Sequence, residues 1–230
     1  MVNALDVQHL NYKKGKYVIL NDVNFTVPHN AICIFAGNNG AGKTSTIKNI
    51  LNLIPNKYGD VFIYGASSTK TISRNGVGYL SEKENFKLNI SSRHFLYEQS
   101  LCSGNTINET NALIKLYTNK FCLSETKMEM PFKLLSSGLK KVVLIINAII
   151  CGHKLIILDE PTEYLDPKTR IIFNQVMKQL HAKGKTIFIS THNLKDVDNL
   201  INWLVIIEDG HIKYCGKRNT KKEIGAFFIE

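Results

Sequence analysis

The feature that most constrains this chain is a glycine-rich run, Gly37-Asn38-Asn39-Gly40-Ala41-Gly42-Lys43-Thr44. It fits the pattern G-x-x-x-x-G-K-[ST], in which glycine backbone curls around an anion because no Cβ is in the way. The apolar residues 31–36 before it predict a buried strand, and residues 45–53 after it predict a helix. Since a helix N-terminus directs N–H groups and positive charge toward an anion, we expect the loop and Ser45 to bind the phosphates of a nucleoside triphosphate.

Two side chains at the end of this loop have the chemistry that triphosphate binding needs. Lys43 is expected to contact the β- and γ-phosphates, and the hydroxyl of Thr44 is expected to ligate Mg²⁺. The alternative is a glycine turn with an incidental Lys-Thr pair. That alternative is disfavoured because the strand before the loop and the helix after it are both in place.

A second group of polar residues follows another apolar strand, at residues 155–158. Asp159 comes directly after this strand and is placed to bind Mg²⁺, while Glu160 is placed to polarise an attacking water as a general base. Ligands in such folds bind at the carboxyl edge of the sheet, where the glycine-rich loop also opens. An acidic pair after a strand is a weak signal alone, but together with the loop it becomes strong.

Two further stretches have chemistry that suits phosphate. Ser136, Ser137 and Gly138 precede an apolar helical segment, where a serine and a glycine at a helix N-terminus form a second anion-binding patch. A simple helix cap is the alternative for these serines. His192 follows the apolar strand at 186–190 and is placed to contact a γ-phosphate, although a lone histidine there is more often a surface residue.

Buried strands that alternate with helices predict an α/β fold with a mostly parallel sheet. Alternating segments in the first thirty residues predict a small antiparallel subdomain, with turn chemistry at Asn21-Asp22. Helical periodicity predicts an inserted lobe at approximately 86–135, and Glu208-Asp209-Gly210 predicts a late hairpin. We expect residues 1–230 to form a single domain.

Composition limits the class of protein. The 230 residues are 44% hydrophobic, which suffices for a sizeable core. No apolar run approaches the roughly 18 residues that a spanning helix needs, and the start lacks a signal-peptide pattern. Any membrane attachment is therefore expected to come through a partner. The cysteines are odd in number and form no C-x-x-C pair, which favours reduced thiols in the cytosol; they are Cys33, Cys102, Cys122, Cys151 and Cys215.

The formal net charge is +10, and part of the excess lies in residues 13–16 and 217–222. A basic balance is compatible with a solvated surface, an anionic membrane surface or nucleic acid. No stripe of basic residues interleaved with aromatic residues stands out, so nucleic acid is not expected as a partner. A solvated surface is the favoured interpretation.

Taken in order, these motifs resemble those of the ATP-binding subunits of ABC transporters, and the resemblance covers nearly the whole chain. Residues 37–44 resemble the family's phosphate loop, and residues 155–160 resemble its acidic strand. Residues 135–139 resemble the signature otherwise written Leu-Ser-Gly-Gly-Gln. Leu165-Asp166 resembles the D-loop that follows the acidic strand, and His192 resembles the switch histidine.

The resemblance implies an ABC ATPase fold, ATP and Mg²⁺ as cofactors, and a head-to-tail homo- or heterodimer with two ATP molecules at its interface. Ser136, Ser137 and Gly138 of one subunit would then face the γ-phosphate held by Lys43 of the other, with Asp166 at the dimer contact. It also implies transmembrane permease subunits as partners. The chain would then lie in the cytoplasm, on the inner face of the membrane.

The chain departs from the usual family pattern at several positions. Glu82 stands where the family usually has glutamine, and we expect it to contact Mg²⁺ or the water on it. In the signature, Ser137 replaces the first glycine and Leu139 replaces glutamine. Drug- and peptide-export members related to bacitracin-resistance transporters have similar changes.

Two other departures concern adenine and the dimer contact. Strict register puts Lys14 where the family has the aromatic residue that stacks on adenine, with Tyr12 and Tyr17 nearby. We choose Tyr12, because an aromatic face over the base is the physical requirement. Tyr164 replaces the usual glycine before Leu165-Asp166, so dimer contacts there are expected to differ.

No departure removes Lys43, Glu160 or His192, so we predict an active ATPase. The favoured function is to power a bacterial ABC exporter of a drug, an antimicrobial peptide or a similar amphipathic cargo. Three alternatives stay open: the ATPase subunit of an importer, an ABC-type ATPase acting on ribosomes or DNA, and a subunit that binds ATP without hydrolysing it. Intact Glu160 argues against the last of these.

Overall fold

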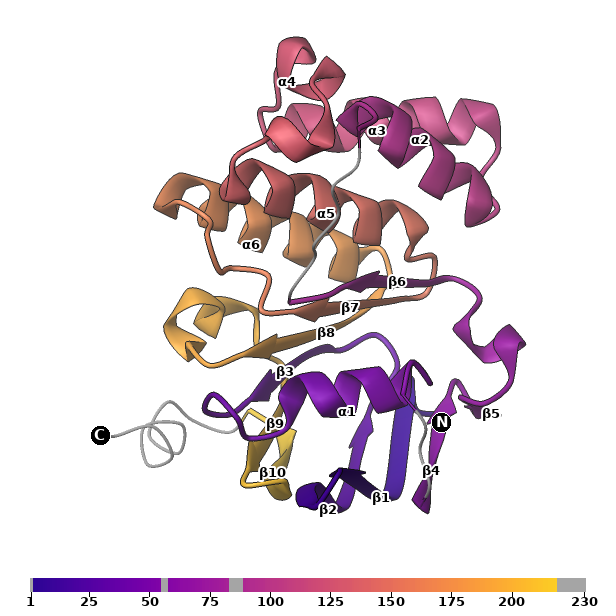
Figure 1. Ribbon diagram of the computed structural model, residues 1–230, viewed down its shortest axis with the longest axis vertical. Coiled ribbons are helices and arrows are strands. Elements are labelled where there is room, and N and C mark those ends of the chain that lie inside the picture. Colours follow the sequence, from indigo (N-terminus) through magenta and orange to yellow (C-terminus); the bar gives the residue numbers. More distant parts are fainter. Residues whose placement is uncertain (1, 55–57, 83–88, 219–230) are drawn as a thin grey trace.

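The computed structural model describes residues 2–54, 58–82 and 89–218, which form layers on a central sheet (Figure 1). The strands of this sheet are β3 (Ile32–Ala36), β6 (Val77–Leu80), β7 (Leu155–Asp159), β8 (Thr186–Thr191), β9 (Trp203–Glu208) and β10 (His211–Lys217). Their order is β10-β9-β3-β8-β7-β6, and all neighbours run parallel except β10 beside β9. Because β3, β7 and β8 are buried throughout, their apolar residues show no alternation.

A smaller antiparallel sheet covers one side of the central sheet. Its strands are β1 (Leu5–Lys14), β2 (Tyr17–Val27), β4 (Tyr58–Ile63) and β5 (Ala66–Ser67), in the order β2-β1-β4-β5. The predicted α/β fold, with a mostly parallel sheet and a small antiparallel part at the N-terminal side, is confirmed.

The expected turn at Asn21-Asp22 is wrong, because β2 continues through both residues. Asp22 instead takes a left-handed φ of 49°, where the pairing of β1 with β2 is irregular. A side chain satisfies the irregular backbone, because the N–H of Asp22 donates to Asn11 Oδ1 at 2.9 Å. The ring Nδ1 of His9 lies 2.8 Å from Asp22 Oδ1 and adds a contact between side chains. The same residues that favour a turn can therefore stabilise a bulge within a strand.

Helices lie on both faces of the central sheet (Figure 1). They are α1 (Lys43–Ile50), α2 (Ser92–Cys102), α3 (Ile107–Lys120), α4 (Glu125–Glu129), α5 (Ser137–Cys151) and α6 (Pro167–Ala182). Four short 3₁₀ turns complete the described elements: η1 (Thr71–Arg74), η2 (Phe132–Leu134), η3 (Leu194–Asp196) and η4 (Asp198–Leu200). Within the described ranges, none of these helices combines the length and the apolar character that crossing a membrane demands.

The central sheet has a hydrophobic core on each face. Ile34 and its neighbours pack toward α5 and α6, whereas the next residue, Phe35, faces the smaller sheet and α1. On that second side the ring centroids of Phe25 and Phe188 lie 5.5 and 5.3 Å from the centroid of Phe35. Packing on both faces fixes the sheet, and therefore fixes the positions at which its strands end.

The lobe expected at 86–135 consists of α2, α3, α4 and η2 in its described part, and residues 86–88 lie outside the described residues. A turn after α2 divides the helical pattern. Thr106 caps α3 in a capping box, in which its hydroxyl accepts from Glu109 N and its own N–H donates to Glu109 Oε2 at 2.8 Å. Arg93 on α2 pairs with Glu125 and Glu129 of α4, which ties the lobe together.

Candidate functional site

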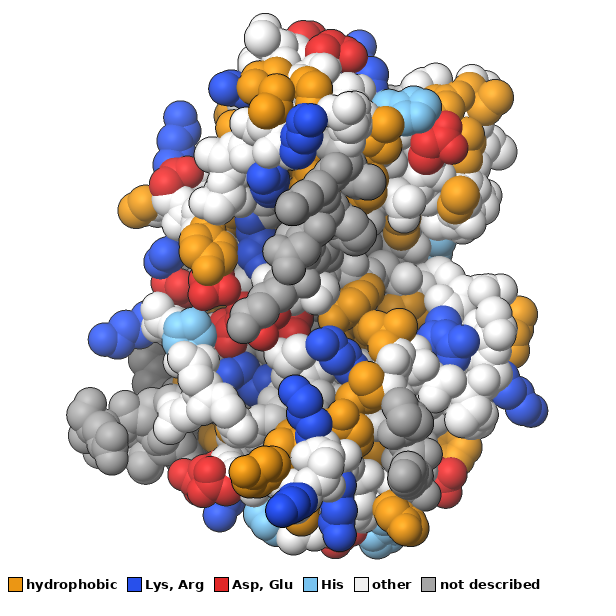
Figure 2. All heavy atoms as spheres, viewed as in Figure 1, with side chains coloured by type: hydrophobic (Ala, Val, Ile, Leu, Met, Phe, Trp, Pro, Cys, Tyr) orange, Lys and Arg blue, Asp and Glu red, His pale blue; other side chains and the backbone are white. Residues whose placement is uncertain are grey.

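The candidate site lies at the carboxyl edge of the central sheet, where β3, β7 and β8 end side by side. The glycine-rich loop follows β3 and leads directly into α1. Gly37 N donates to Thr191 O at 3.3 Å, so this loop is joined to the end of β8. Figure 2 shows acidic side chains and a histidine gathered about half-way up this face of the molecule.

Lys43 is the buried cation of the site, with only 6% of the residue exposed. Its Nζ donates to Gly37 O at 2.7 Å and to Asn38 O at 3.2 Å, so the side chain folds back across the loop. The same atom lies 3.2 Å from Glu160 Oε1 in an ion pair. The loop can take this path because Gly42 has a φ of 107°, and a Cβ there would lie 2.7 Å from Leu20 Cδ2.

Glu160 connects Lys43 with His192. Its second oxygen, Oε2, lies 3.0 Å from His192 Nδ1, and its side chain is only 7% exposed. Glu160 itself has a left-handed φ of 48°, and its N–H donates to Ser190 Oγ at 3.0 Å. A non-glycine residue held in that conformation indicates a position that its surroundings determine strongly.

Asp159 lies deeper, fully buried at the end of β7. Its Oδ1 accepts from Ser190 Oγ at 2.5 Å, while Oδ2 has no hydrogen-bond partner among the described residues. Burial raises the pKa of Asp159 above its usual value, although the hydrogen bond from the Ser190 hydroxyl and the proximity of the Thr44 hydroxyl oppose the shift. A buried carboxylate oxygen without a donor fits a hard cation such as Mg²⁺, which prefers oxygen ligands.

Glu82, which lies two residues after the end of β6, is close to both Thr44 and Asp159. The Thr44 hydroxyl donates to Glu82 Oε2 at 3.1 Å, and the charge of Glu82 contributes to the raised pKa of Asp159. Thr44, Glu82 and Asp159 together therefore form an oxygen-rich corner next to Lys43. This donor set matches Mg²⁺ bound by one or two carboxylates plus phosphate oxygens.

The serine- and glycine-containing stretch lies elsewhere, at the start of α5. Ser136 is the N-cap, and its hydroxyl accepts from Leu139 N at 3.4 Å. Gly138 lies against the D-loop, because a Cβ there would come within 2.9 Å of Tyr164 O. Tyr164 has a left-handed φ of 66° and is 63% exposed.

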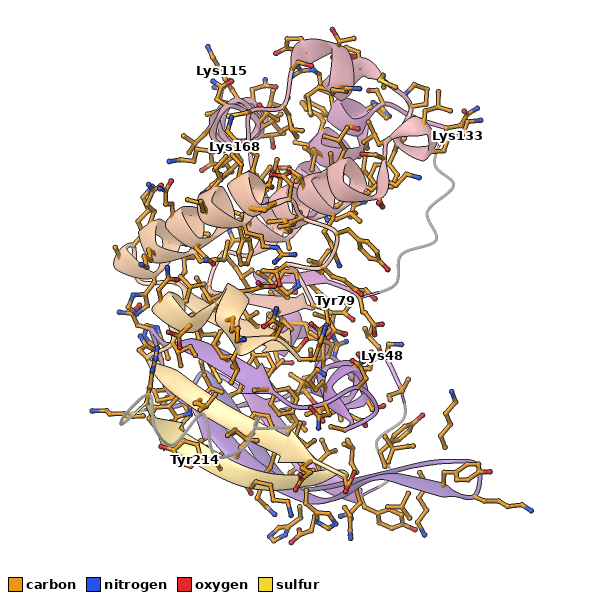
Figure 3. All side chains as sticks on the ribbon, turned by 90° about the vertical axis from the view of Figure 1, so that its left-hand side faces the viewer. Lys48, Tyr79, Lys115, Lys133, Lys168 and Tyr214 are labelled. Carbon is orange, nitrogen blue, oxygen red and sulfur yellow. The ribbon has the colours of Figure 1, made fainter. Side chains whose placement is uncertain are left out.

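A groove of about 450 Å³ lies beside the contact between Gly138 and Tyr164. It is lined mainly by the first turns of α5 and α6 and by the loop after α3. Its lining includes Ser136, Ser137, Gly138, Tyr164, Asp166 and Lys168. In the side view, Lys168 lies at the level of the upper helices, well above Lys48 on α1 (Figure 3). Within the described part of the chain, Lys43 makes its hydrogen bonds and its ion pair with Gly37, Asn38 and Glu160, none of which lines this groove. The two phosphate-type motifs of one chain are therefore separate.

A second hollow, of about 960 Å³, lies at the β1–β2 hairpin. Tyr12 and Lys14 both line it, whereas Tyr17 is not among its lining residues. Leu20 lines it too and lies against Gly42, so this hollow adjoins the glycine-rich loop. Tyr58 also lines it, and the sequence does not single this residue out because its proximity depends on the pairing of Tyr58 with Asn11 across β4 and β1.

Comparison with known proteins decides the family. The model of a family described as ABC transporter matches residues 20–163 of this chain. The chain belongs to the ABC transporter family. A Mycoplasma pneumoniae protein named as an ABC transporter ATP-binding protein is 33% identical over 95% of this chain and 68% of its own length.

Other relatives point the same way. The Nod factor export ATP-binding protein I of Burkholderia lata is 29% identical and covers all of this chain and 76% of its own length. The lantibiotic transport ATP-binding protein SrtF of Streptococcus pyogenes is also 29% identical, over 95% of this chain and 94% of its own length. A solved ATP-binding subunit of an ABC transporter superposes with a TM-score of 0.87 at 27% identity, covering 98% of this chain and 93% of that one. This chain is an ATP-binding subunit of a transporter and an ATPase.

Neutralising Asp159 should stabilise the nucleotide-free protein. The pKa of Asp159 is higher in the folded state than in the unfolded state. The charge of Asp159 therefore begins to oppose folding as the pH rises above the pKa of the unfolded state, and its full effect is reached above the pKa of the folded state. Asp159→Asn keeps an acceptor for Ser190 and removes the charge. We expect a higher Tm at neutral pH, by about 2–4 °C for each kcal/mol recovered, and a smaller gain as pH falls.

Asp166→Asn is the control, because this variant should lower the Tm at neutral pH where Asp159→Asn should raise it. Hydrogen bonds from Thr169 lower the pKa of Asp166, so its carboxylate contributes stability above its unfolded pKa and loses it as pH falls through the folded pKa. Differential scanning calorimetry from acid to neutral pH compares the two variants. A lower Tm for Asp159→Asn at neutral pH would contradict the account of that buried charge.

Proposed function

We propose that this chain binds Mg-ATP at the carboxyl edge of the central sheet and hydrolyses it with Glu160 as general base. The observation that carries the proposal is the convergence of Lys43, at the start of α1, with Glu160 and His192, which follow β7 and β8, through contacts of 3.2 Å or less. A buried cation, a buried carboxylate and a histidine beside a helix N-terminus form the combination that phosphoryl transfer to water requires.

The contacts also indicate how the site changes when ATP enters. Lys43 pairs with Glu160, and the phosphates of ATP offer a stronger concentration of negative charge to the same ammonium group. As Lys43 turns toward the β- and γ-phosphates, Glu160 becomes free to accept a proton from water. His192, which contacts the same carboxylate, lies where it can orient that water or the γ-phosphate. The backbone N–H groups of the loop and of Ser45 hold the remaining phosphate charge.

Asp159, Thr44 and Glu82 are the residues that we propose to hold Mg²⁺, directly or through water. The ion neutralises phosphate charge and fixes the triphosphate when it is bound. The free oxygen of Asp159 and the proximity of Thr44 to Glu82 support this assignment.

Adenine is proposed to lie in the hollow at the β1–β2 hairpin. Tyr12 offers an aromatic face there, and Tyr58 lines the same hollow. Leu20 connects the hollow with Gly42, so a base in the hollow and phosphates on the loop belong to one extended ligand.

The signature residues are proposed to act on ATP held by another subunit. Ser136, Ser137 and Gly138 lie in a groove apart from Lys43 of their own chain, and Asp166 lies beside them. A head-to-tail dimer would bring this groove to the triphosphate of the partner, whether the partner is a second copy or a different ATP-binding subunit. Transmembrane permease subunits would convert the cycle into transport and place the chain on the cytoplasmic face of the membrane.

Export is the proposed direction of transport. One relative supports it by name, as a Nod factor export protein, and another relative is named as a lantibiotic transport protein. Glu82 and the altered signature at Ser137 and Leu139 resemble export members of the bacitracin-resistance type. An amphipathic cargo such as a drug or an antimicrobial peptide is consistent with these relatives.

Glu160→Gln tests the proposed chemistry. Glutamine keeps an acceptor for Lys43 but cannot take a proton, so we expect steady-state hydrolysis of ATP to fall by about 10²–10⁴-fold. ATP binding should persist, and the variant should accumulate as an ATP-bound dimer because hydrolysis no longer opens it. Phosphate release and analytical ultracentrifugation in Mg-ATP measure the two effects.

The matched control is Glu163→Gln, which removes a nearby charge from the same loop without a contact to Lys43. It should hydrolyse ATP like the parent. Turnover in Glu160→Gln equal to that of the parent would exclude Glu160 as the base. Absence of turnover and of dimer in every protein would show that another subunit completes the site.

Tyr12→Ala tests the position of adenine. Loss of one stacked aromatic face typically costs about 1–3 kcal/mol, so the Kd for ATP should rise by about 5- to 150-fold. Tyr12→Phe should bind ATP as the parent does, and so should Tyr17→Ala, because Tyr17 is exposed and outside the hollow. Isothermal titration with ATP measures these affinities, and parent-like binding by Tyr12→Ala would move adenine to another surface.

A further inference from the structure

One arginine side chain outside all the motifs ties two loops of the site together. Arg170 lies on the first turns of α6, and its Nε donates to Leu165 O of the D-loop at 3.1 Å. Its Nη1 forms an ion pair with Asp196 Oδ1 at 2.8 Å. Asn174, one turn further along α6, donates to Asp196 O at 2.9 Å. The same helix face thus holds a loop that follows β7 and a turn that follows β8.

These contacts close a ring around Glu160. In one direction the chain runs from Glu160 through the D-loop to Leu165, which Arg170 holds. In the other direction the carboxylate of Glu160 contacts His192, and η3, which ends in Asp196, begins two residues after His192. Arg170 contacts both ends with one side chain, and Asn174 adds a hydrogen bond to η3, so the base and the histidine are held at a fixed separation.

We propose that Arg170 is a positioning residue for ATP hydrolysis. It fixes the D-loop relative to η3 and thereby holds Glu160 and His192 in the geometry that the chemical step needs. The inference rests on the roles proposed above for Glu160 and His192. It adds that this geometry is maintained from α6, through a residue that touches neither ATP nor the reacting water.

The chemistry of the guanidinium group explains why arginine occupies this position. Its planar fork directs N–H groups to a backbone carbonyl and to a carboxylate at fixed angles, which the single ammonium of lysine cannot do. The ion pair is partly exposed, with 37% of the Arg170 side chain and 14% of the Asp196 side chain accessible. A pair of this kind contributes little to global stability, so its effect is expected in geometry.

Arg170→Met and Arg170→Lys test the inference in the full chain. Both should lower kcat for ATP hydrolysis by about 10- to 100-fold, because small displacements of catalytic groups have effects of that size. The KM for ATP should stay as in the parent, since no phosphate contact is lost. Arg170→Lys should also keep the Tm of the parent. If Arg170 had only a structural role, a loss of kcat would be accompanied by a loss of Tm.

The chain offers a matched control in Arg218→Met. Arg218 pairs with Asp198 Oδ1 at 2.7 Å on the next 3₁₀ turn, η4, so its guanidinium binds Asp198 and not the D-loop. This variant should keep both kcat and KM. Equal losses of kcat in Arg218→Met and Arg170→Met would overturn the proposal, because they would indicate a general loosening of this side of the molecule.

Hydrogen exchange of the nucleotide-free protein tests the link even where turnover needs another subunit. In Arg170→Met, amides of both 160–166 and 191–196 should exchange faster, whereas Arg218→Met should leave 160–166 unchanged. Faster exchange in only one of the two segments, or in neither, would contradict the proposal that Arg170 joins the D-loop to η3. Loss of activity in Arg170→Met beside a fully active Glu160→Gln would contradict the proposed base and leave the link itself intact.

Discussion

The ion pair between Lys43 and Glu160 is the contact on which the site depends. Each charge is almost fully buried, and either of them alone would oppose folding by several kcal/mol. Lys43 follows β3 and Glu160 follows β7, with β8 between these strands in the sheet. The pair can form only because the strand order brings these carboxyl ends together. The sheet topology is therefore a direct condition of the chemistry.

The same pair explains why the nucleotide-free site is stable and yet ready to change. Lys43 forms an ion pair with Glu160 Oε1 and donates hydrogen bonds to two carbonyl oxygens of the loop. His192 lies beside the other carboxylate oxygen of Glu160. A triphosphate supplies the negative charge that Lys43 needs and releases Glu160. When ATP binds, Lys43 exchanges Glu160 for the phosphates, and the same exchange frees Glu160 to act as the base.

Much of this site could be predicted from the sequence, because it depends on local patterns. The glycine-rich run before α1 specifies its own conformation, and Asp159-Glu160 follow a strand that is apolar enough to be buried on both faces. The capping box of Thr106 and Glu109 likewise carries the signal that divides α2 from α3, although periodicity alone reads as one helical stretch.

What the sequence does not reveal depends on long-range pairing or on strained backbone. The hydrogen bond from Ser190 to Asp159 and the approach of Tyr58 to the hairpin hollow arise from strand register. The left-handed conformations of Glu160 and Tyr164 occur without glycine, so no residue type announces them. The bulge at Asp22 uses the residues that usually make turns, and only the paired strand distinguishes the two outcomes.

The most direct test of the account is the crystal structure of Glu160→Gln with Mg-ATP. We predict that Lys43 Nζ leaves residue 160 and contacts the β- and γ-phosphates, with Thr44 and Asp159 at the Mg²⁺ ion or its waters. Adenine should lie in the hollow lined by Tyr12. A triphosphate bound elsewhere, or Lys43 still held by Gly37 O and residue 160 beside bound ATP, would contradict the exchange of partners on which the account rests.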